Sequence, residues 1–475
     1  MSAPTRLAIA GAALALCAAC APLPPAAPAD AAVALPAQYE ADTANVGDAA
    51  IAPRWWTQLG DARLNVLVEQ ALARNNDVLT AMARVREAQA NLAVTDAARQ
   101  PSVSATLGAQ AGRSLGAAGP THTRSAQPGL QASWELDVWG RLSAQSQAAA
   151  ARVQASQADR DAVRLAVAAT TVQGYLSLRA LQEQLAISQA TVASRDKALQ
   201  LAQGQAEVGY TSRLQLTQAQ AEYEAVQQQV AQLAAQIDRQ QQTLNLLLGE
   251  AGGKARWDAQ GATALADLQV PSVPAALPSA LLARRPDIAR AGALLAASDH
   301  TLAAQRAAFL PQVSLSANVG SLLINALHYN PLTVWGLGGS LLAPLFNGGR
   351  LQAQMDVATA QRDQAAYAYR GAVLNAFSDV ENALTATTRL ADQSRHAVRR
   401  RDVLQQSLGY AHDRYEAGYA SYLEELDAQR NLYAAQLEVV RLRQAELDNR
   451  VQLYKALGGG WRPEPEPATP HTPAS

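Results

Sequence analysis

The sequence predicts a mainly α-helical chain that also carries short membrane-type β-strands and uses one structural unit twice. Three observations predict this fold class: an internal repeat, long stretches without proline, and four runs in which apolar and polar residues alternate. The repeated motifs are Leu72–Val78 with Leu282–Ile288, Pro101–Ser104 with Pro311–Ser314, Gly140–Arg141 with Gly349–Arg350, Gly209–Leu214 with Gly418–Leu423, and Leu248–Gly249 with Leu457–Gly458. Five motifs at nearly one offset (287 − 77 = 210 for Asp77 and Asp287) indicate a tandem repeat, which fixes the architecture.

Residues 1–19 predict an export signal, because a positive start is followed by the short apolar stretch Leu7–Leu16. Small residues then precede Cys20, an arrangement that resembles the bacterial lipoprotein signal, in which this cysteine is acylated. The residue three positions upstream is Cys17, where such signals usually have leucine. An ordinary secretory signal cleaved near Ala21 therefore stays open as an alternative.

The composition of the rest of the chain predicts four segments. We expect a lipidated linker and extension at 20–60, a first structural repeat at 61–270, a second at 271–462, and a disordered tail rich in proline and threonine at 463–475. Both cysteines fall in the signal region, so no disulfide is expected in the mature chain. The net charge of −1 and the absence of a basic domain argue against nucleic acid as a partner.

Long helices are predicted wherever proline is missing. No proline occurs between Pro128 and Pro271 or between Pro344 and Pro463, and both stretches are rich in good helix formers. As one helix, 141–208 would extend roughly 100 Å at about 1.5 Å per residue. That length is typical of coiled coils and helical arrays.

Apolar spacing within these stretches supports a helical array. One seam repeats every seven residues, at Leu178, Leu185, Val192 and Leu199. Much of the remaining surface is alanine and glutamine, whose small or neutral side chains permit neighbours on a second face. A simple antiparallel hairpin in solution is the alternative, and the matched second hairpin favours the larger array.

Between the helices, the period changes from 3.6 to 2. The alternating runs predict strands at about 101–113, 128–139, 311–324 and 332–346. Each has the length of a tilted membrane strand, about 9–11 residues or slightly more, with one apolar and one polar face. The aromatic residues expected at membrane interfaces are Trp134, Trp139, Tyr329 and Trp335.

A soluble sheet with one face on a core is the alternative, but no free amphipathic helix is evident to cover the apolar face. Four strands cannot close into a membrane barrel, and an open edge in lipid leaves backbone groups unpaired. Several chains must therefore share one barrel, although this argument does not choose their number.

The turn between each pair of long helices carries the motif Gly-Tyr-x-Ser-x-Leu. The two glycines, Gly209 and Gly418, suit the left-handed conformation that ends a helix, and Ser212 and Ser421 are placed to cap the next helix. Capping alone explains both motifs. Exposed aromatic side chains would add a docking surface, and those expected to be exposed are Tyr210, Tyr419 and Tyr422.

Four motifs together resemble a known family. They are Leu282–Asp287, Leu310–Pro311, Asn347–Arg350 and Tyr454–Trp461, and they resemble the TolC-type outer membrane factors, above all the lipoprotein (NodT-like) outer membrane subunit of resistance–nodulation–division efflux systems. The resemblance implies a homotrimer with one shared 12-stranded barrel in the outer membrane and a helical barrel in the periplasm. It implies a passive exit duct for small molecules, without a cofactor, that docks to a periplasmic membrane-fusion adaptor and an inner-membrane pump.

The resemblance also implies where the functional residues lie. The adaptor-docking tips would comprise Gly209, Tyr210, Ser212 and Leu214 in the first repeat and Gly418, Tyr419, Ser421 and Leu423 in the second. Related ducts carry an acidic ring just before the second tip. The matching gate candidates here are His412, Asp413 and Tyr415, with histidine where relatives often have aspartate.

No catalytic constellation supports an enzyme. The histidines lie far apart and lack metal-ligand spacing: His122, His300, His328, His396, His412 and His471. Two other classes stay open: a protein-secretion duct of type I with the same fold, and a structural trimeric coiled-coil protein of the cell surface. The exported compounds are selected by the pump and have no signature in this chain.

Overall fold

The computed structural model describes residues 28–34, 36, 39–40, 46–47, 51–116, 119–252, 257, 263–270, 273–274, 284–325 and 331–462. The expected signal peptide with Cys20, the aromatic residue Tyr329 and the tail 463–475 lie outside these residues. Contacts divide the chain into two units. The sheet unit contains Met1–Val33, Ala83–Gln157 and Arg290–Ala372, and the core unit contains Ala34–Met82, Ala158–Ala289 and Val373–Ser475.

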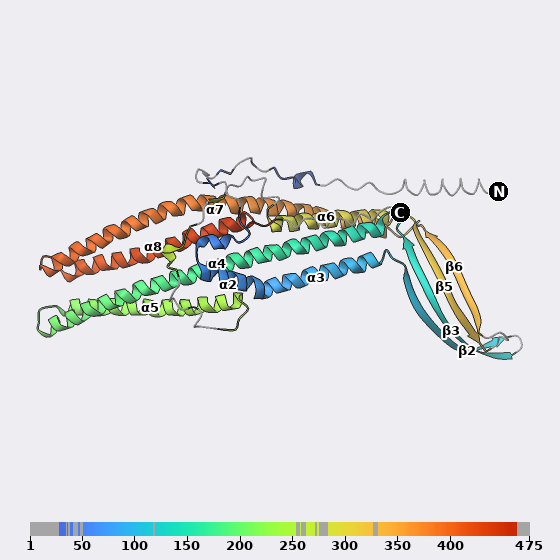
Figure 1. Ribbon diagram of the computed structural model, residues 1–475, viewed down its shortest axis with the longest axis horizontal. Coiled ribbons are helices and arrows are strands. Elements are labelled where there is room, and N and C mark those ends of the chain that lie inside the picture. Colours follow the sequence, from blue (N-terminus) through green and yellow to red (C-terminus); the bar gives the residue numbers. More distant parts are fainter. Residues whose placement is uncertain are drawn as a thin grey trace. The chain divides into compact units, whose positions relative to one another are not determined.

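Helices dominate the described residues (Figure 1). Those of the first repeat are α2 (Ala62–Arg74), α3 (Asn76–Ala97), α4 (Arg141–Glu207) and α5 (Arg213–Leu247), and those of the second are α6 (Pro286–Ala307), α7 (Arg350–Glu416) and α8 (Tyr422–Ala456). The strands of the main sheet are β2 (Ser102–Gly116), β3 (Gly119–Leu136), β5 (Gln312–Ile324) and β6 (Leu332–Leu342). The short elements are η1 (Ala29–Ala31), η2 (Trp55–Leu59), η4 (Leu265–Asp267) and the two-residue parallel pair β1 (Val46–Gly47) and β4 (Val273–Pro274).

The tandem repeat is visible in the lengths of these elements. Helices α4 and α7 each span 67 residues, and α5 and α8 each span 35. The starts of α4 and α7 differ by 350 − 141 = 209 residues, the offset that the motifs predict. Among the described residues, no helix combines the length and the apolar character that crossing a membrane requires.

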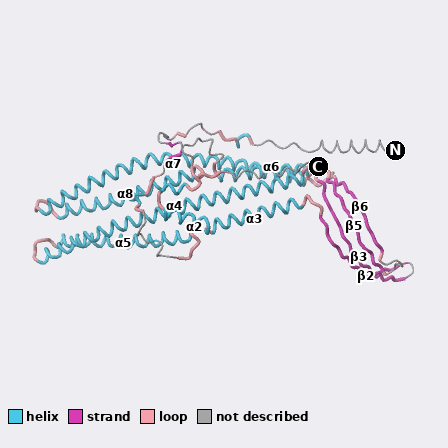
Figure 2. Tube along the Cα trace, in the orientation of Figure 1, coloured by secondary structure: helices cyan, strands magenta, loops and turns pink. Residues whose placement is uncertain are grey.

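The four strands form one antiparallel sheet in the order β2-β3-β5-β6, as the magenta strands of Figure 2 show. Each repeat supplies one hairpin, and β3 joins them by pairing with β5. The register aligns the alternating residues of all four strands: Val103 pairs with Ala132, Ala132 with Ala317, and Ala317 with Leu337. Residues directly opposite each other share a face, so one face is an apolar row. The next row is polar, since Ser102 pairs with Ser133 and Ser133 with Ser316.

Strand β3 differs from expectation at both ends and strand β6 at its second end, each for a local reason. Strand β3 begins at Gly119 and not near 128, because the polar segment before Pro128 pairs residue by residue with β2. It ends at Leu136 and not at 139, because Asp137 accepts hydrogen bonds from the first amides of α4. Strand β6 ends at Leu342, since Pro344 has no backbone N–H to donate.

Trp139 therefore lies outside the strands. Its indole N–H donates to the Pro311 carbonyl at 2.7 Å, while Trp134, which remains within β3, donates to the Arg99 carbonyl at 2.9 Å.

The long helices begin in the same way in both repeats. Gly140 and Gly349 precede them with φ of 73° and 83°, a conformation that glycine adopts without steric cost. Asp137 accepts from the Leu142 and Ser143 amides at 2.9 Å and 2.7 Å. Burial would raise the pKa of Asp137, but the hydrogen bonds from Ser143 and Leu142 outweigh burial and lower that pKa.

The main hydrophobic core lies in the core unit. It brings η2, α2, the middle of α4 and the end of α8 together, and its largest fully buried side chains are Trp55, Tyr175 and Tyr454. Trp55 stacks on Tyr454 with ring centroids 5.6 Å apart. The Tyr175 hydroxyl donates to the buried Asp61 at 2.8 Å, and Asp61 also caps α2. Aromatic burial of this kind contributes a large share of the folding energy of a domain.

The predicted seam on α4 follows this burial pattern. Leu178 and Leu199 are buried, and Leu185 and Val192 between them are half-buried. On the returning helix α5, Val226, Leu233 and Leu244 are buried.

Helices α5 and α8 end on glycines that touch another backbone. Gly249 has φ of 70°, and a Cβ built on it would lie 2.6 Å from the Arg74 carbonyl oxygen. Gly458 has φ of 89°, and a Cβ there would lie 1.8 Å from the Arg284 carbonyl oxygen. No residue with a side chain fits either position. The fifth repeated motif therefore marks a place where two backbones meet.

Asn75 and Arg285, which follow Arg74 and Arg284 in the chain, form hydrogen bonds to the ends of the same returning helices. The Asn75 side-chain amide donates to the Leu247 carbonyl at 3.0 Å, and Arg285 donates to the Ala456 carbonyl at the same distance. Arg285 also binds the carboxylates of Asp287 and Asp379 at 2.6 Å and 3.1 Å. Burial alone would raise the pKa of Asp287, but the hydrogen bond and charge of Arg285 outweigh burial and lower it. Each repeat thus ties its short-helix junction to the end of its returning helix.

We expect Gly249→Ala to destabilise the protein. An alanine held near φ +70° costs roughly 1–2 kcal/mol, and the Arg74 carbonyl must also move. Gly204→Ala is the matched control, because Gly204 lies within α4 with open space around it and alanine there favours the helix by about 0.5–1 kcal/mol. Apparent melting temperatures followed by circular dichroism should fall for Gly249→Ala and stay level or rise for Gly204→Ala. Equal melting temperatures would contradict the backbone contact.

Candidate functional site

The two tip turns, which join α4 to α5 and α7 to α8, are built alike. The Gly209 amide donates to the Ala206 carbonyl at 3.2 Å and the Tyr210 amide to the Gln205 carbonyl at 2.8 Å. This pair of bonds is a Schellman motif, which requires a left-handed residue. Gly209 supplies it with φ of 78°. In the second repeat the Gly418 and Tyr419 amides make the equivalent bonds to Tyr415 and Arg414, and Gly418 has φ of 73°.

The two serines of the tip turns behave differently. Ser212 lies at the N-cap of α5, and its hydroxyl accepts from the Gln215 amide at 3.2 Å. Ser421 lies at the N-cap of α8 with the same extended backbone, but its side chain accepts no capping bond. The expected cap is therefore found at Ser212 and is missing at Ser421. Glu424 and Glu425 in the first turn of α8 supply the negative charge that a helix start favours.

Two of the three tip tyrosines are exposed. Tyr210 and Tyr419 are 88% and 81% accessible, and Leu214 and Leu423 beside them are also exposed. The expectation that Tyr422 is exposed is wrong, since it is only 6% accessible. Its ring packs on Tyr415, with centroids 5.9 Å apart. The buried ring holds α8 against α7, and each tip exposes one tyrosine and one leucine.

An apolar cluster joins the two hairpins just behind the tips. Leu199 and Ala202 of α4 and Ala219 of α5 pack with Tyr422 and Leu426 of α8. These positions lie more than 190 residues apart in the chain, so the hydrophobic periodicity of a single helix does not reveal their pairing.

A charged cluster lies beside the apolar one. Glu222 of α5 accepts from the guanidinium of Arg430 of α8 at 2.8 Å, and Arg195 of α4 lies 3.8 Å from Glu222. Arg195 also binds Gln429 of α8. Arg195 is almost fully buried, and a buried guanidinium requires such partners. Sequence reasoning missed these residues. The sequence feature that could have identified them is a charged residue at a position where the long helix faces inward.

The gate candidates lie on the last turns of α7. His412 Nδ1 lies 3.1 Å from a Glu425 oxygen on α8, and His412 Nε2 lies 3.3 Å from a Glu416 oxygen. The hydrogen bond to Glu425 is the largest effect on the pKa of His412, which is raised above its ordinary value of 6.5. Asp413 is exposed, and Tyr415 contacts Tyr422. Within one chain the structure thus brings His412 to α8 and leaves Asp413 facing outward.

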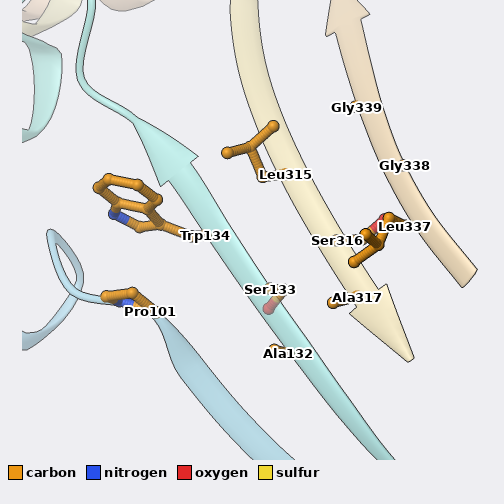
Figure 3. Close-up of a pocket in the computed structure, with 10 residues that line it drawn as sticks. All are labelled: Pro101, Ala132, Ser133, Trp134, Leu315, Ser316, Ala317, Leu337, Gly338 and Gly339. Carbon is orange, nitrogen blue, oxygen red and sulfur yellow. The ribbon is translucent and has the colours of Figure 1, made fainter. Parts of the chain in front are cut away.

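The sheet carries a hollow of about 540 Å³ on its apolar face (Figure 3). Trp134 and Leu315 rise beside it, and Ser133, Gly338 and Gly339 lie along it. It is a shallow concavity of a curved sheet, because alanine, glycine and serine contribute little side-chain bulk there. The hollow holds no titratable side chain, so it is not a chemical site. Over the described residues, no group of histidine, cysteine and acidic side chains has the arrangement of a metal site.

Comparison with known proteins identifies what this architecture resembles. A family profile described as "Outer membrane efflux protein" matches residues 67–250 and 277–459. The pyoverdine export outer membrane protein OpmQ of Pseudomonas aeruginosa is 34% identical over 442 residues, covering 91% of this chain and 93% of OpmQ. The cation efflux system protein CusC of Escherichia coli K12 is 32% identical over 410 residues, covering 86% and 88%. The probable outer membrane lipoprotein SilC of Salmonella typhimurium is 31% identical over 409 residues.

Solved structures agree with these matches. A crystal structure of CusC superimposes with a TM-score of 0.81 at 30% identity, covering 92% of this chain and 99% of that one. The outer-membrane channel OprN gives 0.84 at 27% identity, covering 93% and 100%. The open state of the Neisseria gonorrhoeae MtrE outer membrane channel gives 0.80 at 27% identity, covering 93% and 98%.

We expect Glu425→Gln to lower the pKa of His412. The raised pKa means that the protonated imidazole is favoured in the folded chain, so the contact stabilises the tip below pH 6.5 and is lost as pH rises through the raised value. Modification of the neutral imidazole by diethylpyrocarbonate, followed by mass spectrometry across pH, measures the midpoint. Glu424→Gln is the matched control, since Glu424 pairs with Arg414. An unchanged midpoint in Glu425→Gln would refute the contact.

Proposed function

The chain belongs to the outer membrane efflux protein family and is an outer-membrane efflux channel, and on that premise we propose that three copies form the exit duct of a tripartite pump. The main support for this proposal is the four-stranded sheet. One face is apolar, and the edge strands β2 and β6 each pair on one side only within the described residues. An open edge in hydrocarbon leaves backbone N–H and C=O groups without partners, at a cost of several kcal/mol each.

Other copies of the chain would satisfy these edges. The smallest membrane barrels have about eight strands, so at least two four-stranded sheets are needed. We propose three copies and thus 3 × 4 = 12 strands, with the apolar rows toward lipid and the serine rows toward the lumen. We propose that the helices extend into the periplasm.

The tip turns would then be the surface that meets a periplasmic adaptor. They are the ends of both hairpins, and each presents an exposed tyrosine and an exposed leucine at a rigid Schellman turn. Adaptor and inner-membrane pump would be the two other components. The names of the relatives OpmQ and CusC favour small cargo over protein, since they refer to pyoverdine export and cation efflux.

A lipid anchor would add a second hold on the membrane. We propose that Cys20 is acylated after signal cleavage, which is supported by the relative named an outer membrane lipoprotein. One acyl chain holds a protein only weakly, so the shared barrel would supply the main attachment.

Arginine substitutions on the two faces of β3 test the assembly. Leu130→Arg would place a charge toward lipid and should cost roughly 2–4 kcal/mol per chain near the membrane midplane. Gln131→Arg is the matched control on the opposite face and should be tolerated. Native mass spectrometry of detergent-extracted protein should give the mass of three chains for wild type and Gln131→Arg, with little folded trimer for Leu130→Arg. A stable folded monomer in wild type, or the reverse order of the variants, would overturn the proposal.

Proline in the tip turn tests docking. Gly418→Pro should abolish the turn, because proline fixes φ near −65° and Gly418 has φ of 73°. Trimer formation should survive, since the barrel strands are distant in sequence and belong to the other unit. Site-specific cross-linking to the adaptor and efflux in cells should fall together, whereas Gly409→Ala in the same helix should change neither. Normal export by Gly418→Pro would mean that the motif only ends the helix and does not dock the adaptor.

We also propose that the end of α7 forms the closed gate of the resting duct. Three copies of Asp413 around one axis would repel each other, so contacts such as Tyr415 with Tyr422 must hold the gate shut. Asp413→Ala combined with Tyr415→Ala should raise single-channel conductance in planar bilayers, whereas Asp402→Ala, another exposed position on α7, should not. Conductance identical to wild type in the His412→Ala and Asp413→Ala double variant would place the constriction elsewhere.

A further inference from the structure

A second cavity, of about 480 Å³, lies in the core unit and has no role in the proposed duct. One wall is the turn at the end of α8, where Gly458, Gly459 and Gly460 all have positive φ. The other walls come from η2 with the residues just before it, α2, the start of α3, and the segment 160–168 of α4. Small-molecule sites typically occupy about 300–1,000 Å³, so this volume suits a small ligand.

Two hydrogen-bond donors in the cavity wall lack acceptors. Trp55 and Trp56 are only 1% and 5% accessible, and neither indole N–H has a partner among the described residues. A Cβ at Gly459 would lie 3.3 Å from Trp55 Nε1, which places that N–H at the glycine turn. Buried polar groups in native proteins are nearly always paired, so these two N–H groups are unusual, but both nitrogens are buried in the wall and neither is open to the cavity.

The charge of the cavity is positive. Arg160, Arg164 and Arg462 line it together with one carboxylate, Asp161. Asp161 is already engaged, because it accepts from the Trp461 indole at 2.9 Å and from Arg160 at 2.8 Å. Arg164 and Arg462 make no ion pair with another described residue. The two guanidiniums at the mouth are therefore available to an anion, and planar carboxylates suit them best.

The remaining surface is mostly apolar. Leu72, Met82 and Leu165 contribute aliphatic surface, and the half-buried Trp461 contributes an indole, while Trp55 and Trp56 are almost fully buried in the wall behind it. Such walls favour a ligand with a flat apolar body. A ligand that fits both features carries an aromatic ring for the interior and a carboxylate for the arginines.

We propose that this cavity binds a small aromatic carboxylate, with Arg164 and Arg462 holding the carboxylate and with Trp461 and the aliphatic side chains lining the space for the ring. The proposal goes beyond the duct function, since a conduit needs no enclosed site in its core unit. One chain forms the whole cavity, so ligand binding tests this proposal independently of the trimer and of the partner proteins.

The probe is 4-fluorobenzoate, whose ¹⁹F linewidth reports binding to the purified full-length protein in detergent. Saturable broadening is expected with wild type, and the neutral isostere 4-fluorobenzyl alcohol should bind much more weakly. Arg164→Gln should weaken 4-fluorobenzoate binding about tenfold, because a charge-assisted contact is lost. Arg399→Gln is the matched control, an exposed arginine of α7 outside the cavity, and should bind as wild type does.

Melting temperatures are measured for each variant to control for stability. Arg462→Gln, at an exposed position, gives an independent measure of the effect of charge on binding. No saturable binding by wild type would overturn the proposal. Equal binding of the neutral isostere, or unchanged binding in both Arg164→Gln and Arg462→Gln, would also overturn it.

Discussion

The architecture depends on two places where one backbone meets another with no side chain between them. At Gly249 and Gly458 a returning helix ends against the carbonyl of Arg74 or Arg284. Neighbouring side chains reinforce each junction, Asn75 in the first repeat and Arg285 in the second, by binding the last carbonyls of the returning helix. Helix ends carry unsatisfied carbonyls, so these bonds both satisfy the ends and fix the alignment of the hairpins. The two 35-residue helices take their place from these contacts.

The two repeats use different side chains to bind the carbonyls at the end of the returning helix. Asn75 is a neutral amide and needs no counter-ion, while Arg285 brings a buried charge that Asp287 and Asp379 must neutralise. At the tips, Ser212 caps α5 through its hydroxyl, whereas α8 begins with two glutamates and an uncapped Ser421. The repeat therefore conserves backbone geometry and allows the polar groups that satisfy it to change.

The sheet imposes a requirement that one chain cannot meet. Its register puts apolar residues in rows on one face and leaves β2 and β6 as edges. In water such edges would be solvated, but in lipid they must be paired. In the proposed assembly, other copies of the chain would pair these edges, and the polar rows with serine and glutamine would line the lumen. The long helical hairpins also suit packing against other copies, since their alanine-rich surfaces allow neighbouring helices to approach closely.

Local signals in the sequence determined the repeat, the helix lengths, the four strands and the turn glycines, because proline content, alternation and left-handed glycine act over a few residues. Family membership also followed from the motifs. The tertiary structure decided what depends on pairing across about 200 residues. It buried Tyr422 against Tyr415, brought Glu425 to His412, joined Arg195, Glu222 and Arg430, and extended β3 back to Gly119 by pairing with β2. A side chain's neighbours on another helix have no trace in its own periodicity, so only the packed chain reveals them.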